Sequence, residues 1–134
     1  MADLHIEDFF ADSCKIVASI YLVFPRPITL FVEDISGPDE PDEYGVHSAR
    51  HQSCFASMLW LAQENYLSFQ DTIRSEAIDQ AVLSGRCISA LLSPCPESSQ
   101  HQNRIQLIQA AIKTRSNTQM AKAFEPLLHS MVST

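Results

Sequence analysis

The stretch FASMLWLAQENYLSF, residues 55–69, changes its periodicity part of the way along. Its first apolar residues recur at steps of three and four, the spacing of one face of an α-helix: Phe55, Met58, Leu59 and Ala62. Residues 66–69 then alternate in the manner of a β-strand. The stretch therefore predicts the end of an amphipathic helix followed by the start of a strand, and with them a mixed α+β protein.

The residues at the start of the chain predict a long helix and a short extended piece. Residues 4–23 carry apolar side chains at helical spacing, and Asp3 is the candidate N-cap. Two prolines, Pro25 and Pro27, end this helix because proline cannot continue the backbone hydrogen bonds. Residues 27–30 are then expected to be extended.

The next segments lead to the helix that contains the opening stretch. Residues 31–35 either lengthen the extended piece or begin a short helix, and we favour the helix. The segment GPDEPDEYG, residues 37–45, is expected to be a loop because it combines prolines, glycines and carboxylates. The following helix is predicted over residues 47–65.

A β-hairpin is predicted after this helix. Residues 67–73 and residues 78–83 favour strands, and residues 74–77 form the connection between them. Ser84 is well suited to cap a helix over residues 85–92, since its hydroxyl can accept a hydrogen bond from the first helical turn.

The last forty residues predict two further helices. Residues 95–101 form a linker, one helix begins near Gln102, and residues 117–132 form the second helix or extend the first. We divide the chain into a domain of residues 1–94 and a C-terminal helical extension of residues 95–134. The extension is expected to pack on the domain or to join a second copy in a homodimer.

Charge is divided unequally along the chain. Residues 1–97 hold five basic and fifteen acidic side chains, a net charge of about −10, whereas residues 98–134 carry a net charge of about +3. The first part should therefore repel phosphate. The acidic N-terminus and a longest apolar run of nine residues, 16–24, predict a cytoplasmic protein with no membrane span.

Three segments carry a resemblance to a known fold. Residues 24–30, FPRPITL, look like a turn from a first helix into a first strand. Residues 60–67, WLAQENYL, are similar to the pattern W-L-x-x-E-G-Y-I that closes a third helix and enters a wing, with Asn65 in the place of glycine. Residues 81–92, AVLSGRCISALL, resemble the return strand and the helix after it, with Ser84 in the place of threonine. These are features of the winged helix-turn-helix superfamily.

The resemblance covers roughly residues 4–93 and implies a fold and a binding surface. The fold would be α+β and mostly helical, with a small β-hairpin wing and the C-terminal helices added to it. Winged helices that bind DNA place the third helix in the major groove and the wing on the backbone. By this resemblance the DNA-contacting residues are His47, Arg50, His51, Gln52 and Arg74.

A second use of the same fold is protein binding without DNA, as an acidic interaction adaptor. The acidic loop would attract a basic partner through four carboxylates: Asp39, Glu40, Asp42 and Glu43. Fold alone cannot choose between the two partners. The two uses differ in whether the basic side chains gather on one face or are each surrounded by acids.

Metal binding and catalysis find less support in the sequence. His47, His51 and Cys54 are spaced so that they could share a helix face, but the H-E-x-x-H motif is absent and Cys54 fits the apolar core. No nucleophile elbow or glycine-rich phosphate loop is visible. We therefore expect a non-enzymatic protein with no metal and no cofactor.

Overall fold

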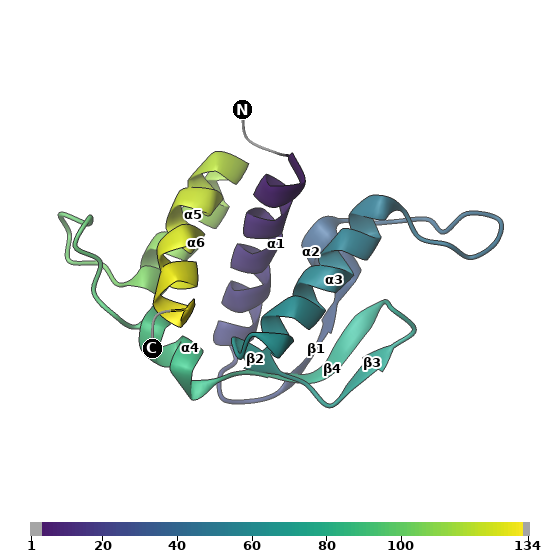
Figure 1. Ribbon diagram of the computed structural model, residues 1–134, viewed down its shortest axis with the longest axis horizontal. Helices are drawn as coiled ribbons and strands as arrows, with labels where there is room; N and C mark the ends of the chain where they lie inside the picture. The colour runs from purple at the N-terminus through teal and green to yellow at the C-terminus, as the bar shows by residue number, and fades with distance from the viewer. Residues whose placement is uncertain (1–3, 133–134) are drawn as a thin grey trace.

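The computed structural model describes residues 4–132, which form an α+β fold. Helices account for 55% of the chain, and a small antiparallel sheet lies against them (Figure 1). This confirms the mostly helical α+β class expected from the sequence. Asp3, the expected first N-cap, lies outside the described residues. Among the helices of residues 4–132, none combines the length and the apolar character needed to cross a membrane.

Helix α1, Leu4–Tyr21, is the central element of the core. Figure 1 shows it between α5 and α6 on one side and α2 and α3 on the other. Its apolar spacing extends around much of its circumference, because it is covered from several directions. The buried apolar side chains of α1 are Phe10, Ala11, Cys14, Ile16, Val17, Ala18 and Ile20.

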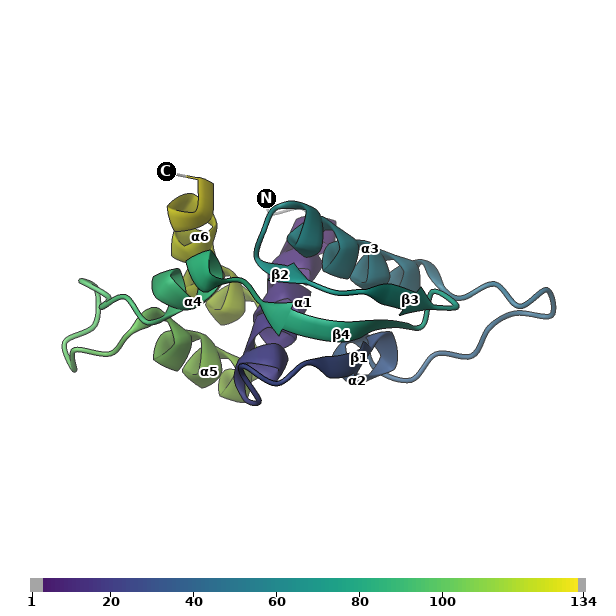
Figure 2. The same ribbon diagram turned by 90° about the horizontal axis from the view of Figure 1, so that it is seen from below.

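The sheet is organised around β4, Ala77–Leu83. β1, Ile28–Phe31, pairs with one edge of β4, and β2, Leu67–Ser68, and β3, Asp71–Ile73, pair with the other; all the pairs are antiparallel. In the view from below, the strands lie in front of α1 and alongside α3 (Figure 2). The predicted hairpin is present, but its first arm is divided into β2 and β3, and β1 adds a strand to its second arm.

The segment after β1 resolves the alternative left open by the sequence. β1 ends at Phe31 and α2, Val32–Ser36, begins at the next residue. Val32 and Ile35 are both buried, which is the spacing of one helical turn. The chain then leaves the core, and residues 37–48 form a loop that extends outward from the molecule (Figure 1).

The opening stretch of the sequence is the end of α3, Ala49–Gln63, and the entry into β2. Asn65 has a φ of 68°, so the corner is made by a residue in the left-handed conformation, as expected. α3 begins two residues later than predicted because the Ser48 side chain accepts a hydrogen bond from the His51 amide and caps the helix there. His47 therefore lies in the loop and not on the helix.

Ser84 connects the start of the next helix to this corner. Its hydroxyl oxygen accepts a hydrogen bond from the Cys87 amide and so caps α4, Gly85–Leu91. The same hydroxyl donates to the Asn65 carbonyl oxygen at 2.6 Å. One side chain thus secures the helix start and the α3–β2 corner together.

The C-terminal segment completes the core of the domain. α5, Arg104–Thr114, begins with a capping box of Asn103 and Gln106, and α6, Asn117–Val132, follows it. Buried side chains of α5 and α6 belong to the same apolar cluster as those of α1: Ile105, Ile108, Ala111, Met120, Ala123, Phe124, Leu127 and Met131. The extension therefore packs on the domain.

Candidate functional site

Arg50, one of the residues expected to contact DNA, is held by α1. Its guanidinium donates two hydrogen bonds to the Asp12 carboxylate, at 2.7 and 2.5 Å, and its Nε lies 4.0 Å from an Asp8 oxygen. The Asp12 hydrogen bonds raise the pKa of Arg50. The Asp12 side chain is 1% exposed and that of Arg50 is 37% exposed. The positive charge of Arg50 thus lies against two carboxylates.

Of the other four expected DNA contacts, His47, His51 and Arg74 lie beside or in the turn between β3 and β4, and Gln52 is an exposed residue of α3. His51 is buried and its Nε2 lies 3.1 Å from the Ser75 carbonyl oxygen. Gln52 is exposed and donates to the His47 carbonyl oxygen at 2.8 Å. Arg74 is exposed in the turn itself, with a φ of 48°. The structure therefore brings the histidines to the β3–β4 turn, and Arg50 points toward α1.

Two further basic side chains are also engaged. The Arg86 guanidinium donates to the Met131 carbonyl oxygen. Arg104 is largely buried, and its guanidinium lies 2.8 Å from a Glu97 oxygen. The pKa of Glu97 is lowered first by a hydrogen bond from its own backbone and then by the hydrogen bond from Arg104. Three of the protein's arginines are therefore bound to groups of the same chain.

Two of the four carboxylates of the acidic loop make contacts within the chain, and two are exposed. Asp42 stabilises the loop itself, since its Oδ1 accepts hydrogen bonds from the Tyr44 amide at 2.8 Å and the Val46 amide at 3.0 Å. Asp39 turns toward α3 and contacts His47. Glu40 and Glu43 are exposed.

Asp39, His47 and His51 form a polar cluster where the loop meets α3. Asp39 Oδ2 lies 2.9 Å from His47 Nδ1 and accepts a hydrogen bond from the Ser48 amide at 3.1 Å. The imidazole rings of His47 and His51 are stacked, with centroids 3.7 Å apart and an interplanar angle of 6°. Hydrogen bonding from Ser48 and then from His47 lowers the pKa of Asp39 to about 2, and the Asp39 hydrogen bond raises the pKa of His47.

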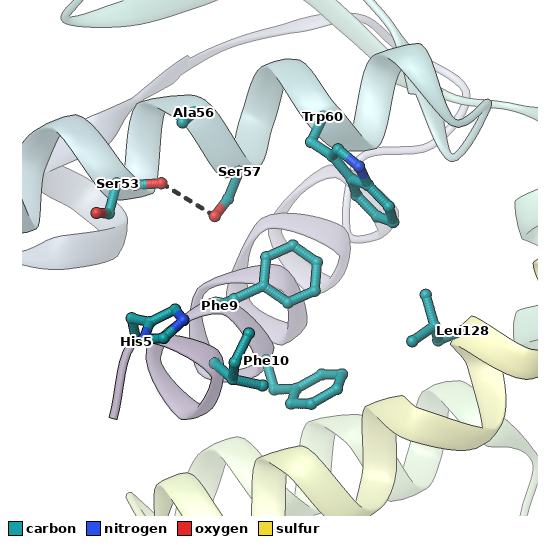
Figure 3. A pocket seen from close by; sticks show the side chains of 9 residues that line it. His5, Phe9, Phe10, Ser53, Ala56, Ser57, Trp60 and Leu128 are labelled. Carbon is teal, nitrogen blue, oxygen red and sulfur yellow. Dashed lines mark hydrogen bonds between the residues drawn. The ribbon is translucent and has the colours of Figure 1, made fainter. Parts of the chain in front are cut away.

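An apolar groove of about 580 Å³ opens on the other side of α3, between α1, α3 and α6 (Figure 3). Its lining residues are His5, Ile6, Phe9, Phe10, Ser53, Ala56, Ser57, Trp60 and Leu128. The one hydrogen bond drawn in Figure 3 joins the Ser57 hydroxyl to the Ser53 carbonyl oxygen at 3.0 Å. Because this bond satisfies the Ser57 hydroxyl within α3, the surface of the groove is mostly apolar.

Aromatic rings shape this groove. Phe9 and Trp60 meet edge to face, with centroids 5.3 Å apart, and both rings lie in the space between α1 and α3 in Figure 3. Phe124 of α6 packs against the phenylalanines of α1, with its ring centroid 6.4 Å from that of Phe9 and 6.0 Å from that of Phe10. Trp60 and Ile6 remain 37% and 44% exposed.

The sequence interpretation did not identify this groove. It placed Phe9 and Phe10 in the first helix without assigning them a surface role, and it used Trp60 as part of the resemblance to winged helices. A usable signal was present, since Trp60 lies beside the apolar stripe of its helix and not within it. The parts of the groove that come from α1 and α6 could not be located from the sequence, because they depend on how these two helices pack.

The chain matches no family model, no curated protein and no solved structure. Its function is therefore inferred from the geometry of the described residues.

Proposed function

We propose that this chain is a non-enzymatic, winged-helix-like module that binds a protein partner. The order of elements supports the fold assignment: a helix, a strand, two helices, a strand pair and a further helix, with β4 between β1 and the β2–β3 row. The left-handed Asn65 corner and the Ser84 cap lie where the resemblance expects them.

The apolar groove is the observation that carries the choice of partner. Contiguous apolar surface that remains open in a folded domain commonly marks an interaction site. The groove lies between helices, and its wall includes an aromatic pair, Phe9 and Trp60, of the kind that anchors interfaces. A helix of the partner would insert apolar side chains spaced at three and four residues.

The charge of the domain specifies the partner further. Residues 1–97 have a net charge of about −10, and Glu7 on α1 is the next residue after Ile6 of the groove. An amphipathic helix with lysine or arginine beside its apolar stripe is therefore the occupant that fits both the groove and its surroundings.

DNA binding is the second candidate, favoured by the exposed position of Arg74 in the turn between β3 and β4. Phosphate contacts usually dominate DNA affinity. Arg50 and Arg104 are paired with acids of the same chain, and Arg86 is bound to a carbonyl oxygen, which favours a protein partner over DNA. A homodimer through the C-terminal helices remains a prediction.

Trp60 provides a direct test because it is the single tryptophan of the chain and lies in the groove. The protein is titrated with a designed basic amphipathic helix, with the same composition in scrambled order, and with mixed duplex DNA at low salt. The ordered helix should shift the Trp60 emission to shorter wavelength and bind, whereas the scrambled peptide and the DNA should not.

Two matched variants locate the binding surface. Ile6→Ser removes an exposed apolar side chain inside the groove, and Val46→Ser removes a similarly exposed one in the 37–48 loop. We expect Ile6→Ser to weaken peptide binding about tenfold and Val46→Ser to leave it unchanged. Salt-sensitive DNA binding that weakens in Arg74→Ala, together with no response to the helix, would replace the protein proposal by the DNA one.

A further inference from the structure

We propose that Asp39, His47 and His51 form a binding site for a divalent transition-metal ion, with zinc as the first candidate. Each residue offers one ligand atom, and the three atoms lie within 4.8 Å of one another. Two imidazole nitrogens and one carboxylate oxygen are a ligand set typical of zinc. This set differs from the one considered from the sequence, since Cys54 is buried in the core and Asp39 of the loop is the third ligand.

The distances suit one small ion. Asp39 Oδ2 lies 2.9 Å from His47 Nδ1 and 4.0 Å from His51 Nδ1. Donor atoms about 2.0–2.1 Å from a tetrahedral zinc ion are separated from one another by roughly 3.3 Å. The two observed distances lie on either side of that value, and the ligand atoms of His47 and His51 lie within 4.8 Å of each other.

His51 supplies an independent reason to expect a ligand. It is 2% exposed, and its Nε2 lies 3.1 Å from the Ser75 carbonyl oxygen, which can only accept a hydrogen bond. Nε2 must therefore carry the proton, and in the neutral ring Nδ1 is left with a lone pair. That buried Nδ1 has no hydrogen-bond partner among the described residues, and it faces a carboxylate oxygen, another acceptor. A cation between them would satisfy both atoms.

The outer nitrogen of each ring has an acceptor from the turn between β3 and β4. Nε2 of His51 meets the Ser75 carbonyl oxygen, and Nε2 of His47 lies 3.4 Å from a Glu76 oxygen. Histidines that bind metals almost always donate their second N–H to a carbonyl or carboxylate in this way, which fixes the tautomer and orients the ring. The neighbouring Ser48 amide similarly holds Asp39.

One rearrangement accompanies binding. The stacked, nearly parallel rings do not both aim their Nδ1 lone pairs at a single point. His47 is the side chain that turns, because it lies in the loop before α3, whereas the His51 ring is enclosed in the core. The metal displaces a proton from His47 Nδ1, and water completes the fourth position.

The test uses untagged protein under reducing conditions, so that neither a histidine tag nor an oxidised thiol binds the ion. Calorimetric titration with zinc should give one ion per chain, and cobalt(II) should develop a visible absorption band that reports its coordination. His47→Ala and Asp39→Asn should each weaken binding at least about a hundredfold, and Glu76→Gln about tenfold. Zinc should also raise the melting temperature of the wild-type protein.

Matched controls make the outcome decisive. His101→Ala removes an exposed histidine outside the cluster and should leave zinc binding unchanged. His47 and Asp39 are only partly buried, so their variants are expected to fold, which circular dichroism verifies. Full affinity in both His47→Ala and Asp39→Asn, or failure of the wild-type protein to bind zinc at micromolar concentrations, overturns the proposal. Peptide binding in the groove is measured separately, so either proposal can fail alone.

Discussion

α3 presents two unlike sides. Toward the 37–48 loop and the β3–β4 turn, it offers His51, whose surroundings are set by individual polar contacts. Toward α1 and α6, it offers Trp60 and the apolar groove, where area and ring packing decide the interactions. The polar side is sensitive to single atoms and single ions, whereas the apolar side is sensitive to volume.

The largest effect is expected in the core behind the apolar side. Burial raises the pKa of Cys14 and of Cys87 from an ordinary value near 9 to about 12. At pH 8 the thiolate fraction, and with it the rate of reaction with a disulfide reagent, should be about a thousandfold lower than for the unfolded chain. Stopped-flow measurements with and without denaturant give both rates.

The same two thiols predict a pH dependence of stability. Between pH 9 and pH 12 the folded chain keeps protons that the unfolded chain loses, so the free energy of unfolding should fall as pH rises above 9. Fast native-state reaction at pH 8 would show that the core opens readily and would weaken the contrast between the two sides.

Phe124→Ala should break the apolar side directly. Phe124 is fully buried and its ring packs on Phe9, Phe10 and Tyr66. We expect a loss of about 3–5 kcal/mol in the free energy of unfolding, measured by urea denaturation. Val132 lies on the same helix and is 72% exposed. The substitution Val132→Ala should therefore change the free energy of unfolding by no more than about 0.5 kcal/mol.

A small effect of Phe124→Ala would mean that the C-terminal helices are dispensable for the domain. Residues 1–94 would then be stable without residues 95–134, although the two parts share one apolar core.

The pair Asp12–Arg50 joins α1 to α3 at the boundary between the two sides. A double-mutant cycle of Asp12→Ala and Arg50→Ala should give a coupling energy of about 1–2 kcal/mol, at the lower end because Arg50 is 37% exposed. Coupling near zero would indicate that Arg50 is free for an external partner, and the DNA candidate would gain support.

Ser84→Ala should have the smallest of these effects. Loss of the α4 cap is expected to cost about 1 kcal/mol, and the bond to the Asn65 carbonyl oxygen is lost with it. Ser89→Ala, on the exposed face of the same helix, is the control and should be neutral or slightly stabilising. Equal effects of the two substitutions would mean that the cap does not contribute to stability.

Local rules in the sequence predicted most of the elements. The prolines after residue 24, the left-handed Asn65 and the Ser84 cap each act over a few residues, so their consequences were visible without the fold. The start of α3 was misplaced by two residues because the cap at Ser48 was not recognised. The division of the first hairpin arm into β2 and β3 depends on pairing with β4 and was not predicted.

The candidate sites depend on long-range packing, and the sequence could not bring their parts together. Asp39 was chosen for its charge and His47 for DNA contact, yet the structure places them against each other, with His47 also beside Glu76, thirty-seven positions beyond Asp39. Likewise, the sequence presents Arg50 as an unpaired cation, whereas in the structure it is hydrogen-bonded to Asp12, thirty-eight residues away.

The interruption between β2 and β3 also affects how the folded protein behaves at high concentration. A long, straight strand edge is a template on which another chain can add a strand, which is a common route to aggregation. Here β2 spans two residues and β3 three, and the amide of Gln70 between them donates to the Asp79 carbonyl oxygen at 2.9 Å. At the opposite edge, the register of β1 shifts between Ile28 and Leu30. Both borders of the sheet are thus poor templates for an incoming strand.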